Sequence, residues 1–265
     1  MSVTVERLQA AGCVAAEEEA QELLSAAPDP EVLEAWLLRR EQGEPLAWIT
    51  GGVAFAGRWL KVASPVYVPR AQTEELARRA ATRLPDHGRA LDLCTGAGPV
   101  AAHLQAEVPT AWIVGVELER NAARCAAGNG VRVVVGDLDN PVGGSHPFDV
   151  VTAVPPYVPT GQLRFLPADV QRFEPRAALD GGPDGLEVAR RIVLAAGRLL
   201  RPGGWLLVEL GGEQDQALAA PLAASAFGEV ELWYDEDGEL RGLAARAQGP
   251  GGGARRGLLG AAGWR

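Results

Sequence analysis

The chain has 265 residues, of which 47% are hydrophobic, enough for one large domain or for a domain with a small accessory piece. A formal net charge of −9 and three scattered cysteines argue against a nucleic-acid-binding surface, a metal site and a disulfide framework. The first residues lack a signal peptide's apolar segment and no apolar run could span a bilayer, so we expect a cytoplasmic, metal-free protein without membrane contacts.

Residues 1–47 predict a small helical domain. Apolar residues recur at spacings of three and four in segments that Gly or Pro separates. The predicted helices are residues 5–12, 15–27 and 30–43. Residues 48–70 then place β-branched and aromatic side chains between glycines, which indicates a hairpin-like connector.

Residues 71–248 predict a doubly wound α/β domain. Its strands are almost continuously apolar and alternate with helices, which is typical of a parallel sheet covered on both faces. The predicted strands are residues 89–94, 111–118, 131–138, 148–154 and 205–211. The predicted helices are residues 71–84, 98–108, 119–128, 185–200 and 216–226, the fourth ended by the sequence RPGG. A hairpin around the turn DEDG closes the domain, and the Gly-rich residues 249–265 predict a flexible tail.

The clearest motif is LDLCTGAGP, residues 91–99, where a strand runs through Asp92 into a turn with Gly96 and Gly98. Glycines let a ligand approach the backbone closely, and the following helix offers free N–H groups. The same turn is compatible with a plain strand-to-helix connection. It also lacks the third glycine of the dinucleotide fingerprint, because residue 101 is alanine.

Acidic residues follow at the ends of the next two strands. Glu117 lies about 20 residues beyond the glycine turn, where a carboxylate can accept both hydroxyls of a ribose. Asp137 ends the third strand and can face an adenine amino group. Each acid alone could cap a helix or a turn, but their placement at successive strand ends favours a bound adenosine.

In this order LDLCTGAG, GVELER, GDL and VPPY resemble the seven-stranded AdoMet-dependent methyltransferases. More narrowly, the chain resembles the HemK/PrmC family, which methylates a glutamine side-chain amide in translation release factors. The resemblance covers residues 1–248 and includes VYVPRAQTEEL, RFEPRAALDGGPDGL and RPGGWLLVELG. It implies a class I, Rossmann-like sheet behind a helical N-terminal domain that contacts the substrate.

The resemblance also implies a binding site for AdoMet, with S-adenosylhomocysteine as the product. Glu117 would hold the ribose hydroxyls, and Asp137 with Leu138 would border the adenine. The methionine and ribose end would be lined by the glycine turn, with Asp92 before it, namely Cys94, Thr95, Gly96, Ala97 and Gly98. The connector residues over the cofactor would be Pro69, Arg70 and Thr73.

The turn VPPY, residues 154–157, departs from the NPPY of the family. There the Asn side chain and the carbonyl of the first proline accept hydrogen bonds from the amide NH₂ and orient its nitrogen for attack on the methyl group. Val154 has no acceptor, so an amide bound in the same way would lose one partner, at a cost of about 1–3 kcal/mol. The candidate catalytic and acceptor-binding residues are Val154, Pro155, Pro156 and Tyr157, in which the prolines supply rigidity and the tyrosine an aromatic wall for the acceptor.

Three functions therefore stay open. The first is methylation of a protein nitrogen, such as a glutamine amide of a release factor. The second is a small-molecule N- or O-methyltransferase with an amine, guanidine or amino-acid-like acceptor, and the third is a non-catalytic AdoMet-binding protein. Glu174 and Asp169, in the loop after VPPY, are candidate orienting groups or proton acceptors, or else surface charges. The sequence leaves the methyl acceptor and the oligomeric state undecided.

Overall fold

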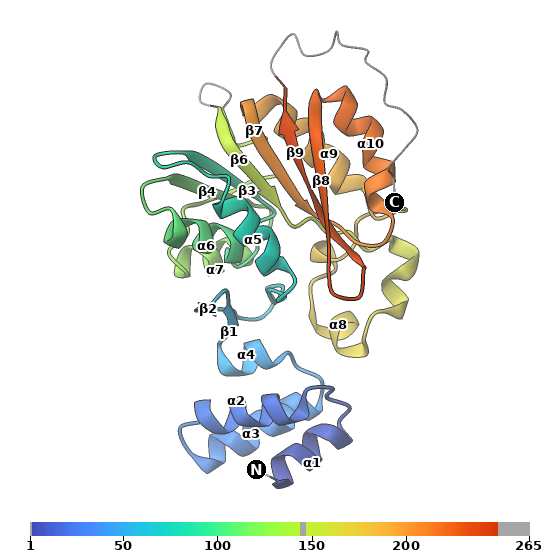
Figure 1. Cartoon of the computed structure of the whole chain (residues 1–265). Coiled ribbons are helices and arrows are strands. Elements are labelled where there is room, and N and C mark those ends of the chain that lie inside the picture. Colours follow the sequence, from blue (N-terminus) through green and yellow to red (C-terminus); the bar gives the residue numbers. More distant parts are fainter. Residues whose placement is uncertain (1, 144–146, 249–265) are drawn as a thin grey trace.

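The structure is a computed structural model that describes residues 2–143 and 147–248. A group of helices forms the N-terminal end, and a seven-stranded sheet with flanking helices forms the rest (Figure 1). The predicted Gly-rich tail, residues 249–265, lies outside the described residues.

The N-terminal helices have a small core of their own. Leu8, Leu23 and Leu37 come from three different helices and are buried together in it. Asp29 begins the third helix by accepting a hydrogen bond from the backbone N–H of Val32 at 2.9 Å. The helices are α1 (Ser2–Ala10), α2 (Ala16–Ala26) and α3 (Pro30–Glu41). This separate core supports our proposal that an N-terminal domain ends near residue 47.

The connector differs in part from the predicted hairpin. Residues 48–50 belong to a short helix, α4 (Leu46–Thr50), which Gly51 ends with a left-handed φ of 87°. A helix of five residues is too short to show a helical period in the sequence. The hairpin follows it as β1 (Gly52–Phe55) and β2 (Arg58–Lys61). The Trp48 indole N–H donates to the carbonyl of Val66 at 2.9 Å and so fastens α4 to the rest of the connector.

The sheet has the strand order β5-β4-β3-β6-β7-β9-β8. Its strands are β3 (Arg89–Leu93), β4 (Trp112–Glu117), β5 (Val133–Val135), β6 (Phe148–Ala153), β7 (Leu200–Glu209), β8 (Phe227–Tyr234) and β9 (Leu240–Ala247). The first five strands of that order are parallel, and β9 is antiparallel to both of its neighbours. The chain moves outward from β3 through β4 to β5 and then returns to the other side of β3 as β6. Ligands of such sheets bind where the order reverses, at the carboxyl ends of the strands.

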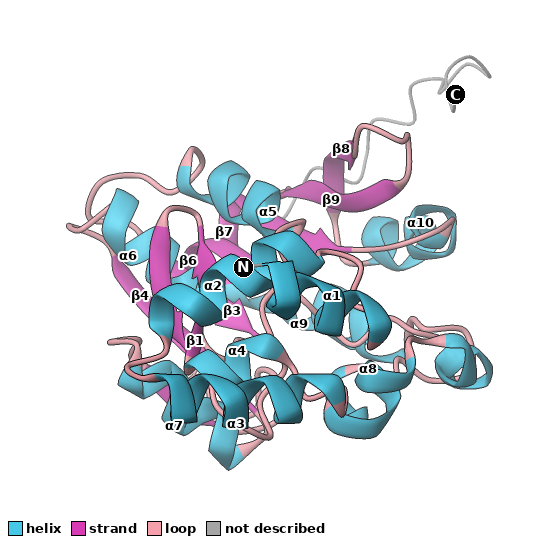
Figure 2. Cartoon of the chain, turned by 90° about the horizontal axis from the view of Figure 1, so that it is seen from below, coloured by secondary structure: helices cyan, strands magenta, loops and turns pink. Residues whose placement is uncertain are grey.

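Two hydrophobic cores cover the two faces of this sheet. Successive side chains of β7 alternate between them, since Leu206 and Val208 belong to one core and Leu207 to the other. The covering helices are α5 (Thr73–Ala81), α6 (Pro99–Glu107), α7 (Arg120–Gly128), α9 (Glu187–Leu199) and α10 (Gln214–Ala224). Figure 2 looks from the side of the N-terminal helices and shows them in front of the sheet. In the described part of the chain, no helix combines the length and hydropathy needed to cross a membrane.

Two segments differ from the prediction. The sequence RPGG, predicted to end a helix, lies inside β7, which begins at Leu200. The β6–β7 register shifts between Phe148 and Val150, so the proline and glycines sit at an irregularity that tolerates them. Residues 160–178, for which we predict no element, form the short helices η1 (Thr160–Phe165), α8 (Ala168–Phe173) and η2 (Arg176–Ala178).

A buried carboxylate ties the turn after β3 to β6. Asp92 is 1% exposed and accepts hydrogen bonds from the hydroxyls of Thr95 at 2.5 Å and Thr152 at 2.7 Å. Burial raises the pKa of Asp92 from 3.8 to about 6, and the two hydroxyls oppose this shift. The two segments that contain the candidate motifs, residues 94–98 and 154–157, therefore leave the sheet side by side.

We predict that Asp92→Asn changes the pH dependence of stability. Because the pKa of the folded state, about 6, lies above the ordinary value of 3.8, stability from this group is complete below 3.8 and is lost as the pH rises through 6. The difference between these two pKa values corresponds to about 3 kcal/mol in the free energy of unfolding. Asparagine does not titrate, so urea unfolding of both proteins at several pH values should show the wild type losing stability relative to the variant over this range. Parallel curves would contradict this role of Asp92.

Candidate active site

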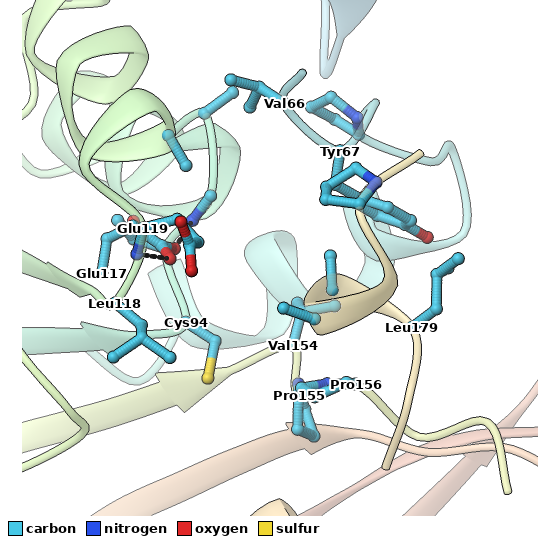
Figure 3. Close-up of a pocket in the computed structure, with 18 of the residues that line it drawn as sticks. Val66, Tyr67, Cys94, Glu117, Leu118, Glu119, Val154, Pro155, Pro156 and Leu179 are labelled. Carbon is cyan, nitrogen blue, oxygen red and sulfur yellow. Dashed lines mark hydrogen bonds between the residues drawn. The ribbon is translucent and has the colours of Figure 1, made fainter. Parts of the chain in front are cut away.

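A cavity of about 640 Å³ opens at the carboxyl ends of β3, β4 and β6. Figure 3 shows Cys94, Glu117 and Leu118 on one side of it, Tyr67 and Leu179 on the other, and Val154 with both prolines between them. Its walls thus come from the sheet, from the connector and from residues 160–178. The cavity lies at the point where the strand order reverses, as expected for this topology.

The glycine turn and Glu117 form one unit at the end of β4. Glu117 is 9% exposed, and its carboxylate accepts the backbone N–H of Gly96 at 2.8 Å and that of Glu119 at 2.9 Å. Burial raises the pKa of Glu117, and these backbone donors oppose the rise. Each carboxylate oxygen keeps a second lone pair for another donor. The predicted acid is therefore held rigidly at the cavity wall, ready to bind two hydroxyl groups.

The two glycines of the turn have different roles. Gly96 has a left-handed φ of 57°, and a Cβ added there would meet no atom within 4 Å, so its backbone faces open space. Gly98 has a φ of 84°, and a Cβ there would lie 2.8 Å from a methyl of Val131. Gly96 thus leaves room for a ligand. Gly98, which we predicted to line the cofactor, instead lets the turn pack against the residues after α7. The other predicted turn residues, Cys94, Thr95 and Ala97, line the cavity.

The end of the cavity beside β5 is bordered by Asp137 and Leu138. We expected the Asp137 carboxylate to face an adenine amino group, and in the structure it pairs with Arg191 of α9 at 2.7 Å. Arg191, which sequence analysis missed, also lines the cavity. Burial raises the pKa of the nearby Cys94 thiol, which stays protonated at neutral pH and lies in the wall as a small apolar group.

The Tyr157 hydroxyl belongs to a partly buried hydrogen-bond network that sequence analysis did not find. The side-chain NH₂ of Gln72 donates to the Tyr157 hydroxyl and to Glu209, both at 2.9 Å. Glu209 also accepts the hydroxyl of Thr73 at 2.6 Å and that of Tyr157 at 3.3 Å. Burial raises the pKa of Glu209, which is 2% exposed, while its donors favour the charged form. The predicted cofactor residue Thr73 lines the cavity and is anchored by this carboxylate.

An ion pair between Arg70 and Glu174 fastens the loop 160–178 to the connector. Arg70 lines the cavity, forms an ion pair with Glu174 and stacks on the ring of Tyr67, with its guanidinium carbon 5.0 Å from the ring centre. Glu174 is 7% exposed, and its second carboxylate oxygen has no partner among the described residues. Burial raises its pKa and Arg70 opposes this shift. Glu174 does not line the cavity and acts on it through Arg70.

Two further predictions concern proton acceptors and metals. Asp169 lies beside Gly43, at the N-terminal helices, and is not part of the cavity wall. Asp92 reaches the wall, but both of its oxygens accept hydrogen bonds from threonines. Within residues 2–143 and 147–248, no cluster of three or more His, Cys, Asp or Glu side chains could hold a metal ion.

Comparison with solved structures shows a methyltransferase fold. The chain matches a methyltransferase of Pyrococcus furiosus with a TM-score of 0.55 and 17% identity, over 81% of this chain and 98% of that one. It matches a 16S rRNA N2-methyltransferase of T. thermophilus, solved with AdoMet and guanosine, with a TM-score of 0.51 and 18% identity, over 75% of this chain and 44% of that one. These likenesses confirm the predicted α/β class.

The curated relatives are more similar in sequence. The chain is 39% identical to the release factor glutamine methyltransferase of Geobacter sulfurreducens, over 78% of this chain and 75% of the relative. It is 35% identical to that of Thermosynechococcus vestitus, over 83% and 80%. It is also 37% identical to the 4-amino-L-phenylalanine/4-methylamino-L-phenylalanine methyltransferase of Streptomyces pristinaespiralis, over 76% and 72%. No family model matches the chain.

These similarities extend over most of the chain and agree with a cavity built from the glycine turn, Glu117 and the VPPY turn. The chain therefore belongs to the release factor glutamine methyltransferase family, HemK/PrmC, and is an AdoMet-dependent methyltransferase.

Proposed function

We propose that this protein methylates the side-chain amide nitrogen of a glutamine in a protein such as a translation release factor. One observation carries the proposal: the VPPY turn lines the same cavity as Glu117 and the glycine turn. The acceptor and the methyl donor would therefore meet between β3 and β6. A protein that acts on a release factor works in the cytoplasm, which is the location we propose.

The residues present fit AdoMet at the β4 side of the cavity. Gly96 leaves open space for the ligand, and the fixed Glu117 carboxylate has free lone pairs for the two ribose hydroxyls. Leu118 and Leu138 would enclose the adenine between apolar side chains. AdoMet, when bound there, would supply a methyl group attached to a sulfonium sulfur. The lone pair of the acceptor nitrogen would form the new N–C bond, and the electron pair of the broken C–S bond would remain on sulfur.

The acceptor side of the cavity orients the nitrogen. The carbonyl of Pro155 has no hydrogen bond to any described residue, so it is available to accept an N–H of the acceptor. Tyr157 has its hydroxyl fixed by Gln72 and Glu209, so its ring forms a rigid wall. The proton that leaves the methylated nitrogen passes to solvent, to which the cavity is open.

A second candidate acceptor is the amino group of a small aromatic amine. Two observations favour it: Val154 removes the acceptor expected for an amide, and a relative of 37% identity is named for 4-amino-L-phenylalanine. An arylamine nitrogen keeps more of its lone pair than an amide nitrogen does and needs less help to attack.

We predict that Glu117→Gln weakens cofactor binding. The amide would turn an NH₂ group toward one of the two backbone N–H donors and would lose a charged acceptor for the ribose. Titration calorimetry with S-adenosylhomocysteine should show a Kd raised about 10- to 100-fold, or about 1.4–2.7 kcal/mol. Glu107→Gln, at an exposed acid on α6, is the matched control and should bind normally. An unchanged Kd in folded Glu117→Gln would remove this residue from the site.

We also predict the outcome of a direct acceptor assay with methyl-labelled AdoMet. Purified release factor should be labelled, and replacing its acceptor glutamine by asparagine should abolish the label, because the longer side chain is needed to reach Pro155. Label on 4-amino-L-phenylalanine alone would favour the second candidate. No transfer to either acceptor, by protein that binds S-adenosylhomocysteine, would contradict both candidates.

A further inference from the structure

The VPPY turn has too few hydrogen-bond acceptors for the nitrogen that receives the methyl group. A primary nitrogen held in a fixed orientation needs a partner for each of its two hydrogens. The Pro155 carbonyl can accept one of them. Val154 cannot accept the other, since its side chain is apolar and packs against the core that contains Val100 and Val150.

Gln72 is placed to provide the second partner. It lies at the N-terminus of α5 and lines the same cavity as Pro155 and Tyr157. Its Nε2 uses both hydrogens, one on the Tyr157 hydroxyl and one on Glu209. Its Oε1 has no hydrogen bond to any residue in the described part of the chain.

Glu209 fixes which end of this amide faces the cavity. An ionised carboxylate only accepts hydrogen bonds, so the nitrogen and not the oxygen of Gln72 must face it. Thr73 and Tyr157 complete its set of donors, which holds the carboxylate in place. Glu209 does not line the cavity, whereas Gln72 does. Because Nε2 is held by Glu209 and by the Tyr157 hydroxyl, we expect the unbonded Oε1 to be the atom that Gln72 offers to a ligand in the cavity.

We propose that Gln72 Oε1 accepts an N–H of the methyl-acceptor nitrogen, in place of the side chain missing at Val154, and that Glu209 is the residue that positions it. This inference rests on the proposed function, in that the acceptor is a neutral primary nitrogen, either an amide or an arylamine. The nitrogen gains positive charge as it attacks, so this hydrogen bond strengthens in the transition state. Its loss should therefore lower kcat more than it raises KM.

The first experiment compares Gln72→Leu with wild type on whichever nitrogen acceptor the wild type methylates. We expect kcat to fall about 5- to 150-fold, the effect of one buried N–H without a partner. The Kd of S-adenosylhomocysteine should not change. Gln105→Leu is the matched control, because this glutamine lies on α6 outside the cavity and, among the described residues, its side chain bonds only the Gly130 carbonyl. A folded Gln72→Leu with wild-type kcat would overturn the proposal.

Rescue separates an acceptor role from a merely structural one. Val154→Asn should restore most of the kcat lost in Gln72→Leu but should add little to the wild type, so the two changes should be strongly non-additive. Glu209→Gln is a second variant, in which the Gln72 amide is free to turn over, and Val154→Asn should rescue it as well. Additive effects in both backgrounds would overturn the proposal.

Binding gives a readout that does not depend on turnover. The acceptor is titrated into wild type and into Gln72→Leu, each saturated with S-adenosylhomocysteine. The substitution should change the Kd of the acceptor by a smaller factor than it changes kcat. A wild type that methylates no nitrogen would refute the proposed function itself. An active wild type with an unaffected Gln72→Leu would refute only the role of Gln72.

Discussion

The buried carboxylate of Asp92 is the interaction on which the arrangement of the site depends. One of its oxygens binds the turn after β3 through Thr95, and the other binds β6 through Thr152. The glycine turn and the VPPY turn leave the sheet at adjacent strands, and this shared acceptor fixes one against the other. Its raised pKa shows that the arrangement has a cost in stability at neutral pH. Asp92 therefore has a structural role in addition to its place in the cavity wall, where the sequence predicts a cofactor-binding residue.

Each half of the cavity contains a buried carboxylate that is held by hydrogen bonds. Glu117 on the cofactor side and Glu209 on the acceptor side are both buried carboxylates enclosed by hydrogen-bond donors of the chain. Glu117 keeps lone pairs that face the cavity, so it can bind a ligand directly. Glu209 does not line the cavity, and its hydrogen bonds reach the wall through Gln72, Thr73 and Tyr157. The difference separates a residue that can bind a ligand from one that can only position other side chains.

The sequence predicted the strands well because their signals are local. Apolar strands ending in a glycine turn or an acid place Gly96 and Glu117 at one edge of the sheet without knowledge of any long-range contact. Gln72 and Glu209 are 137 residues apart, and no pattern in either segment shows that they meet. The short helices of residues 160–178 lack the length for a helical period, and RPGG has the composition of a turn although it lies within β7. Contacts between distant segments decide the Gln72–Glu209 pair and the place of RPGG in β7.

The most direct test of the account is the identity of the methylated atom. Incubation of the protein with an acceptor and AdoMet carrying a ¹³C-methyl group, followed by NMR of the product, shows from the chemical shift whether the methyl carbon is bound to nitrogen, oxygen or carbon. We predict an N-methyl product, because the Pro155 carbonyl and Gln72 Oε1 can each accept one N–H of the acceptor. A methyl group on oxygen or carbon would contradict it, since neither atom could use these two acceptors in the attack.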